Sequence, residues 1–173
     1  DLETRDPNLK TLGSGSVIGN GEVVGIAVAV PGRKFYFPIA HGSGPNMDRK
    51  RTLEWFQDTL NTKAIKIFHN AMYDVCWIRS VTGKVMKGKI VDTMIAASVI
   101  DENRFKYSLD ALSKDYLNEE KYKYDLQQKT LEWSGGTVKD PMTNMHKLPA
   151  SIVKDYAKQD VDLTFKLWNL FNK

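Results

Sequence analysis

The sequence is poor in the residue types that form disulfide frameworks and histidine-based metal sites. It contains one cysteine, Cys76, and three histidines, His41, His69 and His146. A single cysteine excludes an intramolecular disulfide and is typical of a reducing compartment. The histidines lack the spacing of a zinc site, so we expect them to have structural or supporting roles.

The sequence also lacks long apolar runs. No stretch approaches the roughly 18 residues that a membrane-spanning helix needs, and no signal peptide is visible. We therefore expect no contact with a membrane and a cytoplasmic location. The chain opens directly on Asp1 and stops within a helical pattern, so we expect a single domain, residues 1–173, that is a fragment of a longer chain.

The composition is typical of a globular domain. The 173 residues are 42% hydrophobic and 27% charged, which is enough apolar material for one sizeable core. The formal net charge is +4, and the pI is near 9.0. This mild excess of lysine and arginine is compatible with a phosphate-bearing partner but does not identify one.

Hydrophobic periodicity predicts strands first and then alternating helices and strands. Apolar, β-branched runs predict strands at residues 1–5, 22–30, 34–39, 64–68 and 89–93. Helical spacing predicts helices at residues 47–62, 69–81, 94–101, 108–117 and 149–171. Polar, irregular loops are expected at residues 10–21 and 119–149. This order favours an α/β fold with a mixed sheet and helices packed on it.

A carboxylate interrupts the apolar stripe of the last predicted helix. Asp160 lies in the middle of a stripe that is built from Val153, Tyr156, Ala157, Val161, Thr164, Leu167 and Trp168. An unpaired buried carboxylate is costly, so Asp160 needs a cation, hydrogen bonds or a proton. Pairing with a lysine or arginine of the core is one explanation, and a metal site is another.

Acids recur at two other places where the predicted element directs them inward. Asp1 and Glu3 are two apart in a strand, so both side chains point to the same face. Asn70 and Asp74 are four apart in a helix and share one face. Taken alone, the first pair could be solvated, as most such pairs are, and Asp74 could be a hydrogen-bond partner at a helix start.

If the four acids meet, they predict a metal site. Two unit charges 4 Å apart repel by about 4 kcal/mol at an effective dielectric of 20, so a cluster of four carboxylates cannot stay ionised unaided. Mg²⁺ and Mn²⁺ suit all-carboxylate sites that keep water ligands. Two such ions form the arrangement that is used for in-line displacement at phosphorus. We therefore expect two ions, Mg²⁺ or Mn²⁺.

The sequence resembles a known family at these acids. The matching segments are "DLET", "HNAMYD", "KIVDTMIAA", "SLDALS" and "LPASIVKDYAKQDVDLT", which are spread over nearly the whole chain. They resemble the DEDD 3′–5′ exonucleases, in the subclass with a tyrosine before the last aspartate. Within that subclass the chain is similar to the proofreading domain of family A, polymerase I-like DNA polymerases of the phage type. The resemblance implies a ribonuclease H-like mixed central sheet flanked by helices.

The resemblance also implies a role for each matching residue. Asp1, Glu3 and Asp160 would hold one catalytic metal, with Asp1 shared by the second metal and Asp74 acting through its waters. Tyr156 and Glu3 would orient the attacking water. A tyrosine with a pKa near 10 is a poor base at neutral pH, so a positioning role suits it. The remaining matches imply substrate contacts by Asn70, Leu2 and Thr4, and supporting roles for Asp92 and His69.

The family's pattern is incomplete at two places. The strand that leads into Asp1 is absent, and no polymerase motif follows in the sequence. We therefore expect the polymerase domain in the same chain or in an associated one. The expected activity is metal-dependent removal of nucleotides from a DNA 3′ end in a bacterial or phage-infected cell, with the single-stranded 3′ end as the partner.

Two other functions stay open. One is a stand-alone, RNase D-like exonuclease that acts on RNA, because 2′-hydroxyl discrimination depends on pocket shape. The other is a catalytically silent nucleic-acid-binding module, against which the intact set of acids argues. In the segment "NEEKYKYDLQQK", Tyr122 and Tyr124 alternate with lysines. They could stack bases or belong to an ordinary polar surface.

Overall fold

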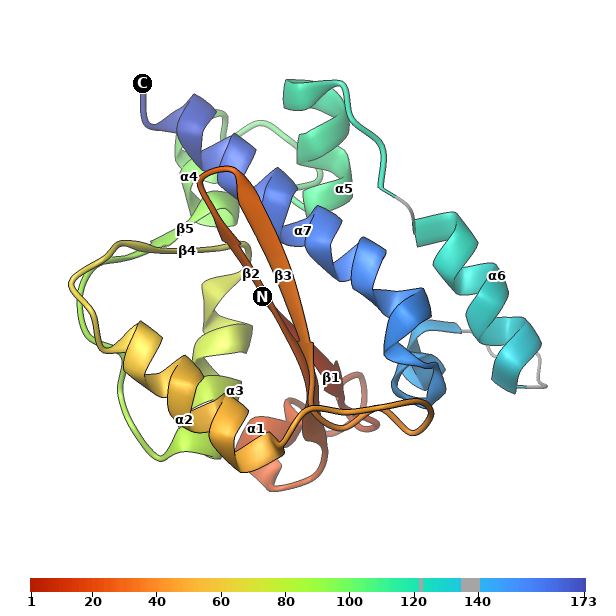
Figure 1. Ribbon diagram of the computed structural model, residues 1–173. Coiled ribbons are helices and arrows are strands. Elements are labelled where there is room, and N and C mark those ends of the chain that lie inside the picture. The colour runs from red at the N-terminus through yellow and green to blue at the C-terminus, as the bar shows by residue number, and fades with distance from the viewer. Residues whose placement is uncertain (122, 135–140) are drawn as a thin grey trace.

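A computed structural model of the chain describes residues 1–121, 123–134 and 141–173 (Figure 1). The strands are β1 (Leu2–Arg5), β2 (Glu22–Val30), β3 (Arg33–Pro38), β4 (Lys66–Phe68) and β5 (Ile90–Asp92). The helices are α1 (Gly15–Ile18), α2 (Arg49–Leu60), α3 (Ala71–Thr82), α4 (Thr93–Ile100), α5 (Leu109–Leu112), α6 (Lys123–Ser134) and α7 (Ala150–Phe171). A π-helical turn, η1 (Ser113–Leu117), follows α5, and a 3₁₀ helix, η2 (Pro141–Lys147), precedes α7.

The predicted α/β class is confirmed, and two local predictions are wrong. All the predicted strands and helices are present within a few residues of their expected bounds. However, the loop expected at residues 10–21 contains the short helix α1, and the segment expected to be irregular at 119–149 contains α6 and η2. Buried Leu126 and Met145 explain the second error, because they pack with the start of α7 and so stabilise helices with little amphipathic pattern of their own.

The strands form two small sheets in the described residues. β1, β2 and β3 are antiparallel neighbours in that order, with Leu2 opposite Ile26 and Ala27 opposite Tyr36. β4 and β5 form a separate parallel pair, with Ile67 opposite Val91. The single mixed sheet that the sequence predicts is therefore not observed among the described residues, because no hydrogen-bonded strand there joins β4 to β1 or β2.

Helix α7 is the long element that crosses the molecule beside the β2–β3 hairpin (Figure 1). Its small side chain Ala157 and its Val161 pack on Ala27 of β2, which brings the helix close to the sheet. Farther along, Leu163 and Leu167 pack with α4 and α5. Because Asp160 lies between Ala157 and Val161 along this packed side of α7, the packing of the helix directs its carboxylate inward.

A second core lies between the antiparallel sheet and helices α2 and α3. Leu2 of β1 and Ile26 of β2 pack there with Phe56 of α2 and with Trp77 and Ile78 of α3. This packing positions α3 behind β1. It therefore brings the first turn of α3, which contains Asp74, close to the acids of β1.

The described helices include no candidate for a membrane span. The longest one, α7, has 22 residues and carries charged side chains along its length. None of the described helices is both long and apolar enough to cross a bilayer.

His41 connects the end of the hairpin to the start of α7, which confirms a structural role for it. The ring is buried, its Nδ1 lies 2.7 Å from the carbonyl oxygen of Leu148, and its Nε2 lies 2.7 Å from the hydroxyl of Tyr36. Because a carbonyl can only accept, Nδ1 carries the proton and Nε2 can accept from Tyr36. Burial lowers the pKa of His41, so the ring is neutral near pH 7.

We expect His41→Gln to lower the free energy of unfolding by about 1–3 kcal/mol at pH 7.5, since one of two buried hydrogen bonds is lost. The loss should be smaller at pH 5.5. The unfolded chain protonates His41 below a pKa of about 6.5 and the folded one only at lower pH, so this histidine destabilises the wild type as the pH falls. Urea unfolding of both proteins at both pH values measures the difference, in which the other titrating groups cancel. An equal loss of unfolding free energy at the two pH values would contradict the lowered pKa of His41.

Candidate active site

Three carboxylates meet between β1 and α7. One oxygen each from Asp1, Glu3 and Asp160 can be chosen so that all three lie within 4.8 Å of one another. Glu3 and Asp160 are buried, with 7% and 8% of their surface exposed, and Asp1 is half-buried. The structure thus brings together three of the four acids that the sequence singles out.

The strand geometry of β1 accounts for the paired acids. Asp1 is held in register with β2 by two backbone hydrogen bonds, in which its oxygen accepts from the N–H of Ala27 at 3.0 Å and its amino group donates to the oxygen of Ala27 at 3.2 Å. Side chains alternate along the strand. Glu3 therefore joins Asp1 on the face toward α7, and Leu2 points into the core on the other face.

Asp74 lies beside the three acids but is not part of their group. Its side chain is only 3% exposed, and its Oδ1 accepts a 2.8 Å hydrogen bond from the backbone N–H of Leu2, between the two acids of β1. Burial raises the pKa of Asp74, although the hydrogen bond from Leu2 opposes this. Asp74 is thus fixed to the backbone of β1 and lies outside the group of three acids.

Burial makes ionisation of these acids costly. Burial raises the pKa of Glu3 to about 8, and the nearby charge of Asp160 adds to the rise. Burial also raises the pKa of Asp160. Moreover, the buried Oε1 of Glu3 has no hydrogen-bond partner among the described residues. An all-oxygen group with an unpartnered carboxylate oxygen fits a hard divalent cation, which relieves the repulsion and uses the free lone pairs.

Lys121 is a site residue that the sequence analysis missed. Its Nζ lies 2.8 Å from both carboxylate oxygens of Asp160 and 3.4 Å from Oδ1 of Asp110. The pairing of Asp160 with a core lysine, which the sequence analysis left open, is therefore confirmed. Asp160 also belongs to the acidic group, so both contacts are present at once. Lys121 is 39 residues from Asp160 in a segment without clear periodicity, so no sequence signal pointed to this contact.

Tyr156 lies one helical turn before Asp160 and faces the same site. Its hydroxyl is 3.3 Å from Nζ of Lys121, and the ammonium also lies over its ring, 4.8 Å from the centroid. Burial raises the pKa of Tyr156 well above its usual value, and the charge of Asp160 adds to this rise. The hydroxyl therefore keeps its proton at neutral pH, so it can position a water molecule but is unsuited to remove a proton.

Asp92 organises the start of the neighbouring helix α3. Its carboxylate accepts from the backbone N–H groups of Asn70 at 3.0 Å and Ala71 at 2.7 Å, and also from Met94 at 2.8 Å, where it caps α4. Asn70 adopts a left-handed conformation with φ of 63°, and its side chain is exposed. His69 is held through Nδ1, 2.9 Å from the hydroxyl of Thr93. These contacts suit the supporting roles predicted for Asp92 and His69.

Leu2 and Thr4, both predicted to bind substrate, have side chains that already contact other parts of the protein. The side chain of Leu2 is only 6% exposed and packs in the core. The hydroxyl of Thr4 lies 2.6 Å from that of Tyr73. Burial of Leu2 argues against contact between its side chain and a substrate. The predicted base-stacking residues cannot be placed, because Tyr122 and the side chain of Tyr124 lie outside the described residues.

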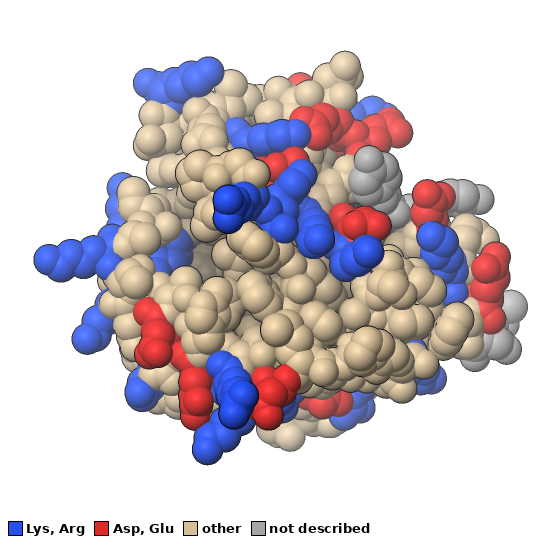
Figure 2. Space-filling model, viewed as in Figure 1, with Lys and Arg blue, Asp and Glu red and all other residues tan. Residues whose placement is uncertain are grey.

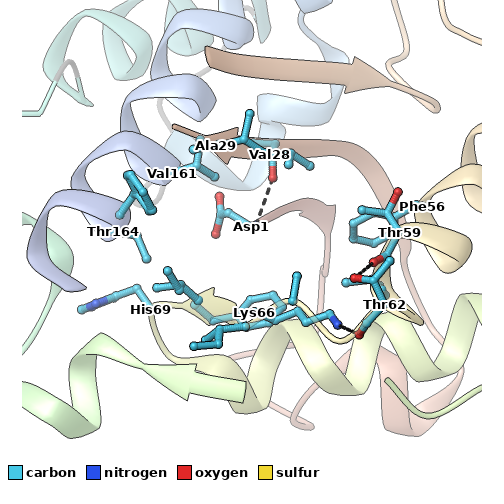
Figure 3. A pocket seen from close by; sticks show the side chains of 18 of the residues that line it. Asp1, Val28, Ala29, Phe56, Thr59, Thr62, Lys66, His69, Val161 and Thr164 are labelled. Carbon is cyan, nitrogen blue, oxygen red and sulfur yellow. Dashed lines mark hydrogen bonds between the residues drawn. The ribbon is translucent and has the colours of Figure 1, made fainter. Parts of the chain in front are cut away.

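The surroundings of the site differ on its two sides. Figure 3 shows Asp1 at an apolar cavity of about 310 Å³ between β2, β4 and α7, of whose described lining Asp1 is the only carboxylate. On the face shown in Figure 2, lysine and arginine side chains gather around α7 and the β2–β3 hairpin, with acids among them. Lys34 and Lys166 both pair with Asp162 there. The cavity thus adds no further acid to the metal group, and the surface nearby is of mixed charge.

A family comparison agrees with this geometry. A family model described as 3′–5′ exonuclease matches residues 17–173. The chain belongs to the 3′–5′ exonuclease family. The match includes Asp74, Tyr156 and Asp160 and begins after Asp1 and Glu3. In the structure, Asp1 and Glu3 nevertheless lie against Asp160, which belongs to the matched region.

Curated relatives of this exonuclease-family chain are DNA polymerases. The chain is 30% identical over 152 residues to DNA polymerase DpoZ of Salmonella phage PMBT28, which covers 86% of this chain and 23% of that protein. It is 33% identical over 141 residues to DNA polymerase DpoZ of Acinetobacter phage SH-Ab 15497, with 79% and 22% covered. With DNA polymerase I of Borreliella burgdorferi the identity is 28% over 140 residues, with 80% and 14% covered. The chain thus spans less than a quarter of the length of these relatives.

We expect Asp92→Ala to lower the free energy of unfolding by about 2–4 kcal/mol, because three backbone N–H groups lose a charged acceptor. Asp48→Ala is a matched control, since Asp48 caps α2 through one N–H, that of Arg51, and should cost only about 1 kcal/mol. Urea unfolding of the two variants and the wild type measures both losses. If Asp92→Ala cost no more than Asp48→Ala, its role at the start of α3 would be wrong.

Proposed function

We propose that residues 1–173 form one metal-dependent 3′–5′ exonuclease domain that removes nucleotides from DNA 3′ ends and proofreads for a DNA polymerase domain. The observation that carries this proposal is the group of Asp1, Glu3 and Asp160, whose oxygens lie within 4.8 Å of one another in a chain of the exonuclease family. The polymerase domain would belong to the same chain or to an associated one. The relatives support this, since they are DNA polymerases about four times as long as the shared region.

The acids supply the proposed metal site. Asp1, Glu3 and Asp160 would hold a divalent cation, Mg²⁺ or Mn²⁺, and Asp1 and Asp74 would serve a second one. When bound, such ions activate water and stabilise the charge that develops at phosphorus. Asp74 is suited to an indirect role, because its carboxylate is fixed by the N–H of Leu2 beside the group rather than within it.

Tyr156 and Asn70 would position the reactants. The protonated hydroxyl of Tyr156 on α7 can hold a water by a hydrogen bond, while Glu3 on β1 orients the same water from the opposite side. Asn70 has an exposed side chain, and its backbone N–H is already used by Asp92. Its amide is therefore free to contact the terminal nucleotide from a rigid helix start. Thr4 has its hydroxyl bonded to Tyr73, which leaves it a secondary substrate contact at most.

The fold that we propose is ribonuclease H-like. In this proposal the antiparallel part, β1–β3, and the parallel part, β4–β5, are two halves of one mixed sheet flanked by helices. The apolar cavity that β2 and β4 both line is the place where the halves approach each other (Figure 3).

A DNA substrate is favoured over RNA because the relatives are DNA polymerases. The rival RNase D-like function and the silent binding module are separated by one experiment. Cleavage of 3′-labelled single-stranded DNA and RNA, side by side and with and without Mg²⁺, distinguishes them. We expect metal-dependent shortening of the DNA from its 3′ end. Preferential cleavage of RNA would favour the rival enzyme, and no cleavage of either would favour the binding module.

We expect millimolar Mn²⁺ to raise the melting temperature of the wild type, because metal binds the folded site and relieves carboxylate repulsion. Asp160→Ala should abolish most of this shift in melting temperature. It should also lower the rate of cleavage by several orders of magnitude, because a group that helps to stabilise charge in the transition state is lost. Asp155→Ala, an exposed acid on the same helix, is the matched control and should behave like the wild type. Near-normal cleavage by Asp160→Ala would refute the proposed site.

Tyr156→Phe tests whether the hydroxyl positions the water. We expect single-turnover cleavage to fall roughly 10- to 1,000-fold at saturating Mg²⁺, the range for one positioned hydrogen bond, with DNA affinity nearly unchanged because the ring remains. Tyr116→Phe is the control, since Tyr116 packs against Phe171 at the far end of α7. Equal rates for wild type and Tyr156→Phe would remove the hydroxyl from the mechanism.

A further inference from the structure

The Lys121 ammonium is the most buried cation near the acidic group. Its side chain is 8% exposed and that of its partner Asp160 is 11% exposed. The other described ion pairs of this region are far more open, such as Lys166–Glu119 at 40% and 38% and Lys114–Glu120 at 67% and 78%. Exposed pairs of that kind contribute little to stability, whereas breaking a buried pair leaves a buried charge uncompensated.

The position of Nζ conflicts with full use of Asp160 as a metal ligand. Nζ lies 2.8 Å from both oxygens of Asp160 and donates a hydrogen bond to Oδ2, while the buried Oδ1 has no hydrogen-bond partner among the described residues. The ammonium therefore uses part of the carboxylate that a hard divalent cation would bind. A cation bound among Asp1, Glu3 and Asp160 would also repel an ammonium at that distance. The two cations therefore compete for the negative charge of Asp160.

A second carboxylate already lies beside the ammonium. Oδ1 of Asp110 lies 3.4 Å from the same Nζ, on the side of α5 rather than of β1. A small movement of the lysine side chain can thus exchange Asp160 for Asp110 without leaving the ammonium unpaired.

From these contacts we propose that Lys121 is a built-in cation of the site, which neutralises Asp160 in the metal-free protein and competes with the divalent metal for it. Metal binding moves Nζ from Asp160 toward Asp110. Lys121 is thus a positioning residue that stabilises the acidic group before loading and sets the metal concentration at which loading occurs. This inference rests on the metal site of the proposed function.

The test compares Mn²⁺ binding to the wild type, Lys121→Met and the control Lys114→Met by titration calorimetry. We expect Lys121→Met to bind Mn²⁺ roughly tenfold more tightly, because a competing unit charge is removed from the ligand. In EDTA the same variant should melt at a lower temperature than the wild type, and saturating Mn²⁺ should narrow that gap. Lys114→Met should match the wild type in both measurements, since its lysine is exposed and paired with Glu120.

The outcomes separate this inference from the metal site itself. If the wild type binds Mn²⁺ and Lys121→Met binds it equally or more weakly, the competition is refuted and the metal site stands. If no Mn²⁺ binds to the wild type at millimolar concentration, both are refuted. Should Lys121→Met fail to fold, NMR of lysine ¹⁵Nζ groups in the wild type decides. We expect one protected ammonium signal in EDTA that shifts on Mg²⁺ titration, and a signal that Mg²⁺ saturation leaves unchanged would overturn the proposal.

Discussion

Mutual repulsion among buried carboxylates is the constraint on which the rest of this site depends. Asp1, Glu3 and Asp160 are held close together and largely away from water, so each ionised group makes the next more costly. Burial, and then the charge of Asp160, raises the pKa of Glu3, whose buried Oε1 has no hydrogen-bond partner among the described residues. The buried ammonium of Lys121 pairs with Asp160 in the same place. The ammonium of Lys121 is a cation that the chain itself places there.

The fold maintains this unfavourable arrangement by fixing each acid to a rigid element. Asp1 is held by backbone bonds to Ala27, and Asp160 belongs to a helix whose start is tied to the hairpin through His41. Asp74 is held by the N–H of Leu2 in a helix whose first turn is bound by Asp92. Moving these elements apart would therefore break apolar packing or buried hydrogen bonds, which opposes the repulsion.

The same supports explain why family membership and geometry point to the same residues. The family match covers the helices that carry Asp74, Tyr156 and Asp160, and β1 lies before it. Strand β1 is nevertheless indispensable to the site, because its alternation directs Asp1 and Glu3 toward α7 while Leu2 anchors the strand in the core. A substitution that loosened β1 would therefore disperse the acids without altering any of them.

The sequence by itself determined the local part of this account. Period-two spacing placed Asp1 and Glu3 on one face of a strand, and helical spacing placed Tyr156 and Asp160 on the inward stripe of α7, because these relations depend only on near neighbours in the chain. The meeting of β1 with α7 followed from the resemblance rather than from the spacing.

Only the tertiary structure decided the long-range contacts. It paired Lys121 with Asp160 across 39 residues, directed Asp74 to the backbone of Leu2, and stabilised α6 by burying Leu126 against the start of α7. Local periodicity does not encode which distant surfaces pack together. Neither the role of Lys121 nor the helix α6 could therefore be predicted until Asp160 and the start of α7 were seen beside them.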